Sequence, residues 1–142
     1  MHWYKADGSG GPNFGFEITA KKFKPETFQN LDLSRWIKAP NGADPIKFST
    51  LEAFVETFGP YGFKMESFCP SYGMSETTNM ITGGVNGTLV PRYVQRGALE
   101  KNRKIIELPH PTLETRTVVS CGVIAPGFDL RIVDPVTLKE CS

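Results

Sequence analysis

Residues 69–78, "CPSYGMSETT", bring several groups that contact nucleotides within a few positions of one another. Tyr72 offers a flat face on which a base can stack, and Ser75 offers a neutral donor for an anionic oxygen. Glu76 offers one carboxylate, about what Mg²⁺ takes from a protein when substrate phosphates supply other ligands. Gly73 lets the backbone approach a ligand closely. These residue types favour a site for a base, a phosphate and a metal ion.

The same residues also fit a purely structural interpretation. Ser75 is a suitable N-cap, Glu76 would be stabilised by a helix dipole, and Tyr72 would pack in the core. The run that follows at 79–84, "NMITGG", fits one helical turn. The residue types alone leave both interpretations open.

The elements that must position this stretch follow from apolar spacing. We expect a strand at 36–40, a helix at 49–58 and a strand leading into a loop at 63–73. Ser49 and Glu52 form a capping box, and Gly59 with Pro60 ends the helix. The apolar residues that recur at helical spacing are Leu51, Phe54, Val55 and Phe58. Strand, helix and strand in this order predict a parallel sheet with a helical crossover.

In open α/β sheets, ligands bind beyond the carboxyl ends of the strands. Two such ends, at 36–45 and 66–76, are rich in groups that contact ligands, and Gly42 lies in the first of them. We therefore expect the two segments to meet around one ligand.

The rest of the chain divides into an α/β half and a mostly β half. Residues 13–23 predict a short helix with Phe14, Ile18 and Lys22 on one side, preceded by a loop at 8–14. From Gly83 onward the sequence changes to short β-type runs separated by Gly, Pro and Asn. These runs lie at 88–94, 104–108, 115–123 and 128–134, with turns expected at 85–88 and 100–104.

Composition excludes several classes of protein. The chain has 142 residues with 16 basic and 15 acidic side chains, and no run of Lys or Arg indicates a nucleic-acid face. It contains neither an apolar stretch near the ~20 residues that span a bilayer nor a signal-peptide core. Three widely spaced cysteines without a C-x-x-C pair predict reduced thiols and no zinc site. We expect a cytoplasmic protein without a membrane span.

The stretch "YGMSETT" resembles the Tyr-Gly-x-(Thr/Ser/Ala)-Glu motif of the adenylate-forming superfamily. Four longer stretches are similar, in order and spacing, to the fatty acyl-AMP ligases, which are stand-alone enzymes or loading domains of polyketide and lipopeptide synthases. They are "SGGPNFGFEI", "LDLSRWIKAPNGADPI", "FCPSYGMSETT" and "VVSCGVIAPGFDLRIVDPVTLKEC". The resemblance covers nearly the whole chain and implies an internal segment of the large N-terminal adenylation domain. We expect an α/β part at 1–83, a β-rich insertion at 84–117 and a β part at 118–142.

The resemblance also implies roles for individual residues. Tyr72 stacks on the adenine, and the backbone of residues 42–44 lies along the purine edge. The family often has Glu where Asp44 stands, which leaves the backbone role unchanged. The nucleotide-binding residues implied in this way are Gly42, Ala43, Asp44, Tyr72, Gly73, Met74 and Ser75.

Two of the implied residues act on the reaction itself. Ser75 matches the position that faces the α-phosphate, where the family often has Ala, and Glu76 matches the Mg²⁺ ligand. Asn13, Phe14 and Gly15 match a segment near the acyl tunnel.

The resemblance implies that the complete protein converts a fatty acid and MgATP into acyl-adenylate and pyrophosphate, then passes the acyl group to a carrier-protein thiol. The superfamily's phosphate loop, ribose-binding Asp and catalytic Lys lie outside these 142 residues, so we expect the chain alone to be inactive. The insertion is expected to restrain the C-terminal domain from the rotation that thioester formation with coenzyme A requires. Two alternatives are an acyl-CoA synthetase of the same superfamily and a non-catalytic module that binds adenylate or lipid.

Overall fold

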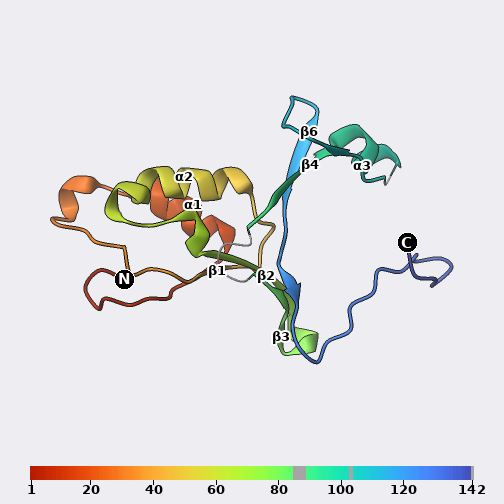
Figure 1. The fold of residues 1–142 in the computed structure, drawn as a ribbon, viewed down its shortest axis with the longest axis horizontal. Coiled ribbons are helices and arrows are strands. Elements are labelled where there is room, and N and C mark those ends of the chain that lie inside the picture. The colour runs from red at the N-terminus through yellow and green to blue at the C-terminus, as the bar shows by residue number, and fades with distance from the viewer. Residues whose placement is uncertain (85–88, 103, 142) are drawn as a thin grey trace.

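The computed structural model describes residues 1–84, 89–102 and 104–141, which form two sheets and three helices (Figure 1). The first sheet has the strand order β1-β2-β3-β7. Its strands are β1 (Ala39–Asn41), β2 (Phe68–Met74), β3 (Asn79–Gly83) and β7 (Val123–Ile124). The second sheet has the order β5-β4-β6 and consists of β4 (Pro91–Gln95), β5 (Glu107–Leu108) and β6 (Thr115–Val119). The chain is therefore mixed α/β, as the sequence predicts.

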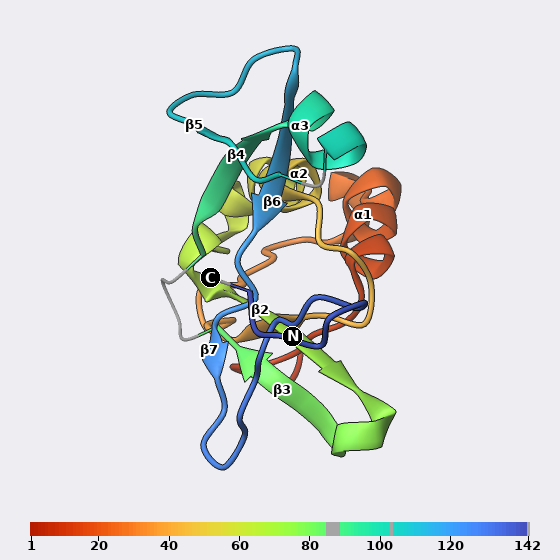
Figure 2. The ribbon, with the colours of Figure 1, turned by 90° about the vertical axis from the view of Figure 1, so that its right-hand side faces the viewer.

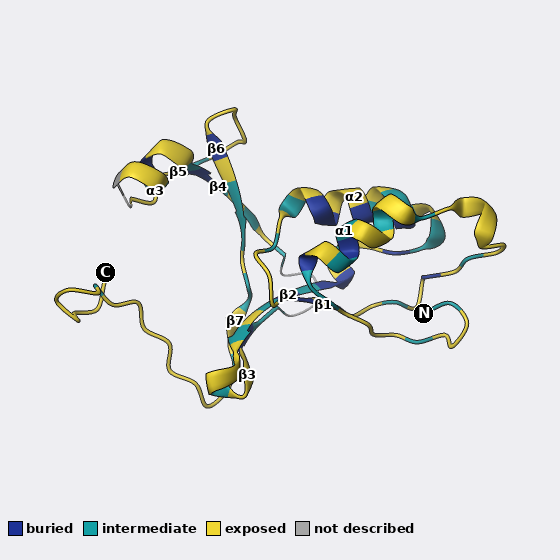
Figure 3. Ribbon diagram, turned by 180° about the vertical axis from the view of Figure 1, so that it is seen from behind, coloured by how far each residue is buried: buried dark blue, intermediate teal, exposed yellow. Residues whose placement is uncertain are grey.

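The α-helices are α1 (Asn13–Lys22), α2 (Phe48–Phe58) and α3 (Arg96–Asn102). Four single turns of 3₁₀-helix accompany them: η1 (Pro25–Thr27), η2 (Gly59–Tyr61), η3 (Met65–Ser67) and η4 (Ser75–Thr77). Figure 3 shows that burial concentrates where α1 and α2 cover β1 and β2. There the Phe16 ring meets Phe54 and Phe68 edge-on, at centroid distances of 5.2 and 5.1 Å. This aromatic core fixes the parallel strands beneath the two helices.

The helix expected at 49–58 is confirmed as α2, which buries Leu51, Phe54 and Phe58 and ends before Gly59. The capping box is wrong, because the helix begins one residue earlier. Lys47 is the N-cap, and it makes no side-chain capping hydrogen bond.

The helix expected at 13–23 is confirmed as α1, but its buried face is different. Asn13 and Phe16 are buried, whereas Phe14 and Ile18 are exposed. Phe16 faces the core because α1 packs against α2 along that side.

The parallel crossover is confirmed: β1 pairs in parallel with β2, with Ala39 opposite Phe68 and Asn41 opposite Pro70. Both strands are shorter at their beginnings than expected. Residues 36–38 precede β1, and the indole of Trp36 donates to the carbonyl oxygens of Ser9 and Lys38. The η3 turn precedes β2.

The one-turn helix expected at 79–84 is wrong, because this segment is the strand β3. Thr78 and Asn79 adopt left-handed backbone angles, with φ of 60° and 97°, and they turn the chain back along β2. Met74 then pairs with Asn79 in an antiparallel hairpin. The helix-cap interpretation of Ser75 and Glu76 is therefore wrong as well: η4 has three residues and no side-chain cap.

The second half keeps its expected β character with two corrections. Helix α3 occupies part of the turn expected at 100–104, and the run at 128–134 forms only an isolated bridge, from Val133 to Glu140. Its side chains are too exposed to hold a strand in place, with Ile132 68% exposed. Strand β6 runs through the expected boundary at residue 117. The turn expected at 85–88 lies outside the described residues.

The chain leaves the first sheet to form the second sheet, and it returns to the first sheet close to where it left. Gly84 donates its N–H to the carbonyl oxygen of Pro70 at 2.7 Å. After β6, Gly122 (φ 84°) lies so close to Gly83 that a Cβ atom there would overlap the Gly83 carbonyl group. Figure 2 shows β4, β6 and α3 projecting together from this point. The chain therefore leaves the first sheet after Gly84 and returns to it at Gly122.

Other sequence expectations concern cysteines and membranes. Cys69, Cys121 and Cys141 form no disulfide bond with one another. Within the described residues, none of the helices has the length and apolar character needed to cross a bilayer.

Candidate nucleotide-binding site

The carboxyl ends of β1 and β2 meet tightly at Gly42. A Cβ atom on Gly42 would lie 2.7 Å from the Ser71 hydroxyl oxygen and 3.0 Å from the Ser71 carbonyl oxygen. The Ser71 hydroxyl donates to the carbonyl oxygen of Asn41 at 3.4 Å. Glycine is required at position 42 because the neighbouring strand fills the space of a side chain.

A hollow of about 300 Å³ opens where these strands end. The loop after β1 lines one wall, the end of β2 lines another, and Cys121 comes from the segment that returns after β6. Tyr72 is 45% exposed here, which is compatible with stacking on its ring. The lining residues are Ala43, Asp44, Pro45, Ile46, Ser71, Tyr72, Gly73 and Cys121. Four predicted nucleotide-binding residues thus line one cavity: Ala43, Asp44, Tyr72 and Gly73.

Ala43 has a left-handed backbone, with φ of 66°. For a residue with a Cβ atom this conformation costs roughly 1–2 kcal/mol. This unfavourable conformation lies in the loop that follows β1, at the edge of the hollow.

Gly73 was expected to let a ligand approach the backbone, but the structure gives a different reason for the glycine. A Cβ atom there would overlap the backbone carbonyl of Asn79, across the bulge that shifts the β2–β3 register between Tyr72 and Gly73. Close approach of β3 therefore requires the glycine.

Met74, Ser75 and Glu76 lie at the hairpin tip, exposed and outside the lining of the hollow. The Thr77 hydroxyl donates to the Met74 carbonyl at 3.0 Å, and the Thr78 N–H donates to the Ser75 carbonyl at 3.2 Å, so the tip is an ordered turn. In the described part of the chain, no three His, Cys, Asp or Glu side chains cluster to hold a metal ion. A lone exposed carboxylate suits Mg²⁺, which keeps waters and phosphate oxygens as its other ligands.

The residues expected near the acyl chain do not converge. Asn13 is buried; its Nδ2 donates to the Thr50 hydroxyl at 3.2 Å, and its Oδ1 accepts from the Lys47 N–H at 3.0 Å. Asn13 thereby joins the start of α1 to the start of α2. Phe14 is 57% exposed, and Gly15 lines a separate hollow beside Phe16.

A hollow of about 590 Å³ lies beside the parallel strands, and the sequence did not indicate it. Its lining is mostly apolar, and Ser71 belongs both to this hollow and to the 300 Å³ hollow at the strand ends, called the nucleotide hollow below for its proposed role. The lining residues are Lys38, Pro40, Cys69, Ser71, Met80, Gly83 and Gly84. Only the pairing of β1, β2 and β3 brings these residues together.

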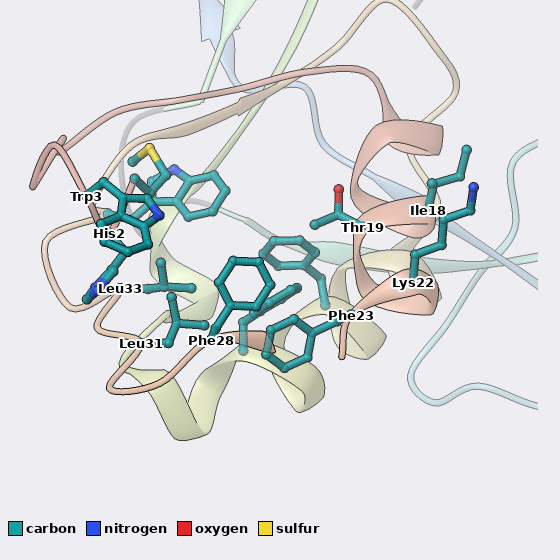
Figure 4. Close-up of a pocket in the computed structure, with 13 residues that line it drawn as sticks. His2, Trp3, Ile18, Thr19, Lys22, Phe23, Phe28, Leu31 and Leu33 are labelled. Carbon is teal, nitrogen blue, oxygen red and sulfur yellow. The ribbon is translucent and has the colours of Figure 1, made fainter. Parts of the chain in front are cut away.

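Another apolar hollow, of about 440 Å³, lies between the first residues of the chain, α1 and the segment around Leu31 (Figure 4). Aromatic rings such as Phe23 and Phe28 line it, and it contains none of the predicted site residues.

Two further residues were not predicted: Cys121, which lines the 300 Å³ hollow, and Asn41, which precedes the loop at its edge. Burial raises the pKa of the Cys121 thiol, which favours the protonated form. Asn41 is fully buried, and its side-chain nitrogen and oxygen both lack a hydrogen-bond partner. Its place at the end of a parallel strand was the available signal for Asn41, whereas Cys121 reaches the site only through the tertiary fold.

No family profile matches the chain. Over 97% of its length it is 38% identical to the medium-chain-fatty-acid–[acyl-carrier-protein] ligase JamA of Moorena producens, and over 94% it is 34% identical to the ligase TtuA of the same description from Teredinibacter turnerae. The chain spans 24% and 21% of these two proteins.

Solved structures of fatty acyl-AMP ligases are also similar to this chain. The fatty acid AMP ligase of Legionella pneumophila superposes with a TM-score of 0.91 over 99% of this chain and 24% of that protein, at 32% identity. A crystal structure of the fatty acyl-adenylate ligase from L. pneumophila, in complex with acyl adenylate and pyrophosphate, superposes with a TM-score of 0.90 at the same identity and coverage.

Proposed function

This chain is a homologue of one segment of the fatty acyl-AMP ligases, and we propose that the complete protein activates a fatty acid with MgATP. The products are acyl-adenylate and pyrophosphate, and the acyl group then passes to the thiol of an acyl carrier protein. The chain spans about a quarter of its relatives, so this activity belongs to the longer protein.

One observation carries the proposal: two segments far apart in the sequence line one hollow at the carboxyl ends of parallel strands. Parallel α/β sheets bind ligands in this place. The half-exposed Tyr72 ring stacks on the adenine, and the backbone of residues 42–44 borders the purine. The neighbour solved with acyl adenylate has the same fold over this segment, which supports a nucleotide in this hollow.

The hairpin tip supplies the phosphate end of the site. A carboxylate oxygen of the fatty acid attacks the α-phosphorus, the new bond gives the acyl-adenylate, and pyrophosphate departs. The Ser75 hydroxyl donates to an α-phosphate oxygen, where negative charge develops in the transition state. Glu76 would hold Mg²⁺, which neutralises phosphate charge when bound.

The 590 Å³ hollow is the proposed place of the fatty acyl chain. Its mostly apolar lining suits an alkyl chain, and the shared Ser71 connects it with the nucleotide hollow. A fatty acid lying there brings its carboxylate toward the nucleotide at this connection. We infer that Ser71 borders both substrates.

The segment between Gly84 and Gly122 is the proposed determinant of the acceptor. Leu89 packs against the main core, and β6 contacts α2, so the segment is attached to the body of the protein. The segment's other apolar residues divide: Val94 is buried, whereas Val90, Ile105 and Ile106 are exposed. We propose that this surface restrains the C-terminal domain, so that a carrier protein and not coenzyme A receives the acyl group.

The test is ATP–pyrophosphate exchange by the intact protein with a series of fatty acids, followed by acyl transfer to carrier protein or coenzyme A. Fatty-acid-dependent exchange and loading of the carrier are expected. Acyl-CoA as the main product would instead identify an acyl-CoA synthetase. Binding of AMP without any exchange would identify a non-catalytic module.

A further inference from the structure

Asn41 is the last residue of β1, immediately before the loop that borders the nucleotide hollow. Its exposed fraction is 0%, and neither Nδ2 nor Oδ1 has a hydrogen-bond partner. Buried polar side chains are nearly always paired, so an unpaired carboxamide calls for an explanation.

Asn13 provides a comparison within the same chain. It is also buried, at 4% exposed, but both of its polar groups are paired, with Thr50 and Lys47. Asn13 has a structural role that its contacts explain. The contacts of Asn41 give it no such role.

Strand alternation places Asn41 on the same face of the sheet as Tyr72, although its side chain does not line the hollow. In β1, Ala39 and Asn41 are buried on one face, and in β2 the same face carries Phe68 and Pro70. Tyr72 follows Pro70 by two residues and so lies on that face, on the strand beside Asn41. The unpaired carboxamide therefore lies on the face of the stacking ring, one residue before Gly42.

We propose that Asn41 reads the edge of the adenine and so selects ATP over other purine nucleotides, a proposal that rests on the proposed function. A carboxamide offers one acceptor and one donor side by side. Adenine presents the complement, its N6 amino group beside the N7 acceptor, and Asn is the side chain that pairs with both. Hypoxanthine has an oxygen at position 6, which faces the carboxamide oxygen as a second acceptor.

Contact with the base requires the loop at 42–44 to move, because Asn41 is fully enclosed. The loop has a reason to move. Ala43 is held in a left-handed conformation and Asn41 is left unpaired, so two unfavourable features adjoin one segment. If nucleotide binding opens the loop, the Asn41 carboxamide gains hydrogen-bond partners and is no longer unpaired.

The experiment compares Asn41→Leu with the wild type in the intact protein, using ATP and inosine triphosphate as probes in fatty-acid-dependent pyrophosphate exchange. Leucine has the same branching and the same number of side-chain heavy atoms as asparagine, and it replaces both unpaired polar atoms by methyl groups. Without nucleotide, we expect the melting temperature of N41L to equal or exceed that of the wild type, whereas N13L melts lower because it leaves Thr50 and the Lys47 N–H unpaired. The preference for ATP in kcat/KM is expected to fall roughly 10- to 100-fold in N41L.

Two results overturn the inference. One is an N41L protein that keeps its ATP preference within threefold. The other is an N41L protein that folds but melts at a lower temperature than the wild type, which would mean that Asn41 has a structural partner. Asn41→Ala removes the same two atoms without adding bulk, and it repeats the selectivity measurement if leucine prevents folding. Absence of exchange in the wild type would refute the proposed function itself, which separates the two failures.

Discussion

Replacing Gly73 by alanine tests how far the site depends on the β2–β3 hairpin. The added Cβ atom would overlap the Asn79 carbonyl oxygen and lie 2.9 Å from the Met80 Cα atom, closer than real Cβ atoms approach. Neither neighbour is a flexible side chain, so the two strands must separate.

The magnitude follows from what the separation breaks. The pairs Gly73–Met80 and Met74–Asn79 close the hairpin beside its tip. A backbone hydrogen bond contributes about 0.5–1.5 kcal/mol net, so losing two costs roughly 1–3 kcal/mol of unfolding free energy. Displacement of the tip also moves Ser75 and Glu76, and a misplacement near 1 Å is enough to lower the rate by about 10²-fold.

Chemical denaturation and pyrophosphate exchange of the intact protein measure both effects. Gly97→Ala is the matched control, because a Cβ atom at Gly97 in α3 meets no atom within 4 Å. It should stabilise the helix by about 0.5–1 kcal/mol and leave exchange unchanged. A Gly73→Ala protein with wild-type stability and exchange within threefold would refute the role of the hairpin.

Three further predictions concern the rest of the site. Glu76→Gln should keep the fold and lower adenylation by ~10²-fold or more, the scale for loss of one positioned stabiliser; exchange within threefold of the wild type would remove Glu76 as the metal ligand. Replacing residues 85–120 by a short Gly/Ser turn should keep adenylation and permit acyl-CoA synthesis; a folded, adenylating variant that makes none would contradict the restraining role. Because burial raises the pKa of Cys121, less thiolate is present at neutral pH, so alkylation should be slower there than at the exposed Cys141 and should accelerate as pH rises. Mass spectrometry should show ATP protecting Cys121 alone, and equal protection at Cys141 would contradict its place in the hollow.

The sequence predicted the parts of the fold that depend on regular apolar spacing. Leu51, Phe54 and Phe58 recur at helical intervals, and the structure buries all three in α2. The parallel crossover followed from the order of elements around that helix. The convergence of Ala43 with Tyr72 was likewise predictable, because both follow the carboxyl ends of neighbouring parallel strands.

The β2–β3 hairpin, the larger hollow and the unpaired Asn41 depend on backbone conformation and strand register, which residue types alone do not determine. Thr78 adopts a left-handed angle that is rare for a β-branched residue, so Asn79 was the one turn signal for the hairpin that makes 79–83 a strand. The larger hollow needs Lys38, Met80 and Gly84 in one place, and only strand register brings them together. Hydrogen bonds to its side chain show that Asn13 has a structural role, and Asn41 has no such bonds. The sequence alone cannot distinguish the two asparagines.

The contact between Gly83 and Gly122 brings the two ends of the intervening segment together, so this position can accept segments of different sequence. Any segment whose two ends reach Gly84 and Gly122 closes the same sheet, because the β3–β7 pairing and the Gly84–Pro70 hydrogen bond lie outside the segment. Each doubling of such a loop costs only about 0.6 kcal/mol in closure entropy. A segment of different length or sequence can therefore replace this one while the pairing of β1, β2 and β3 stays unchanged.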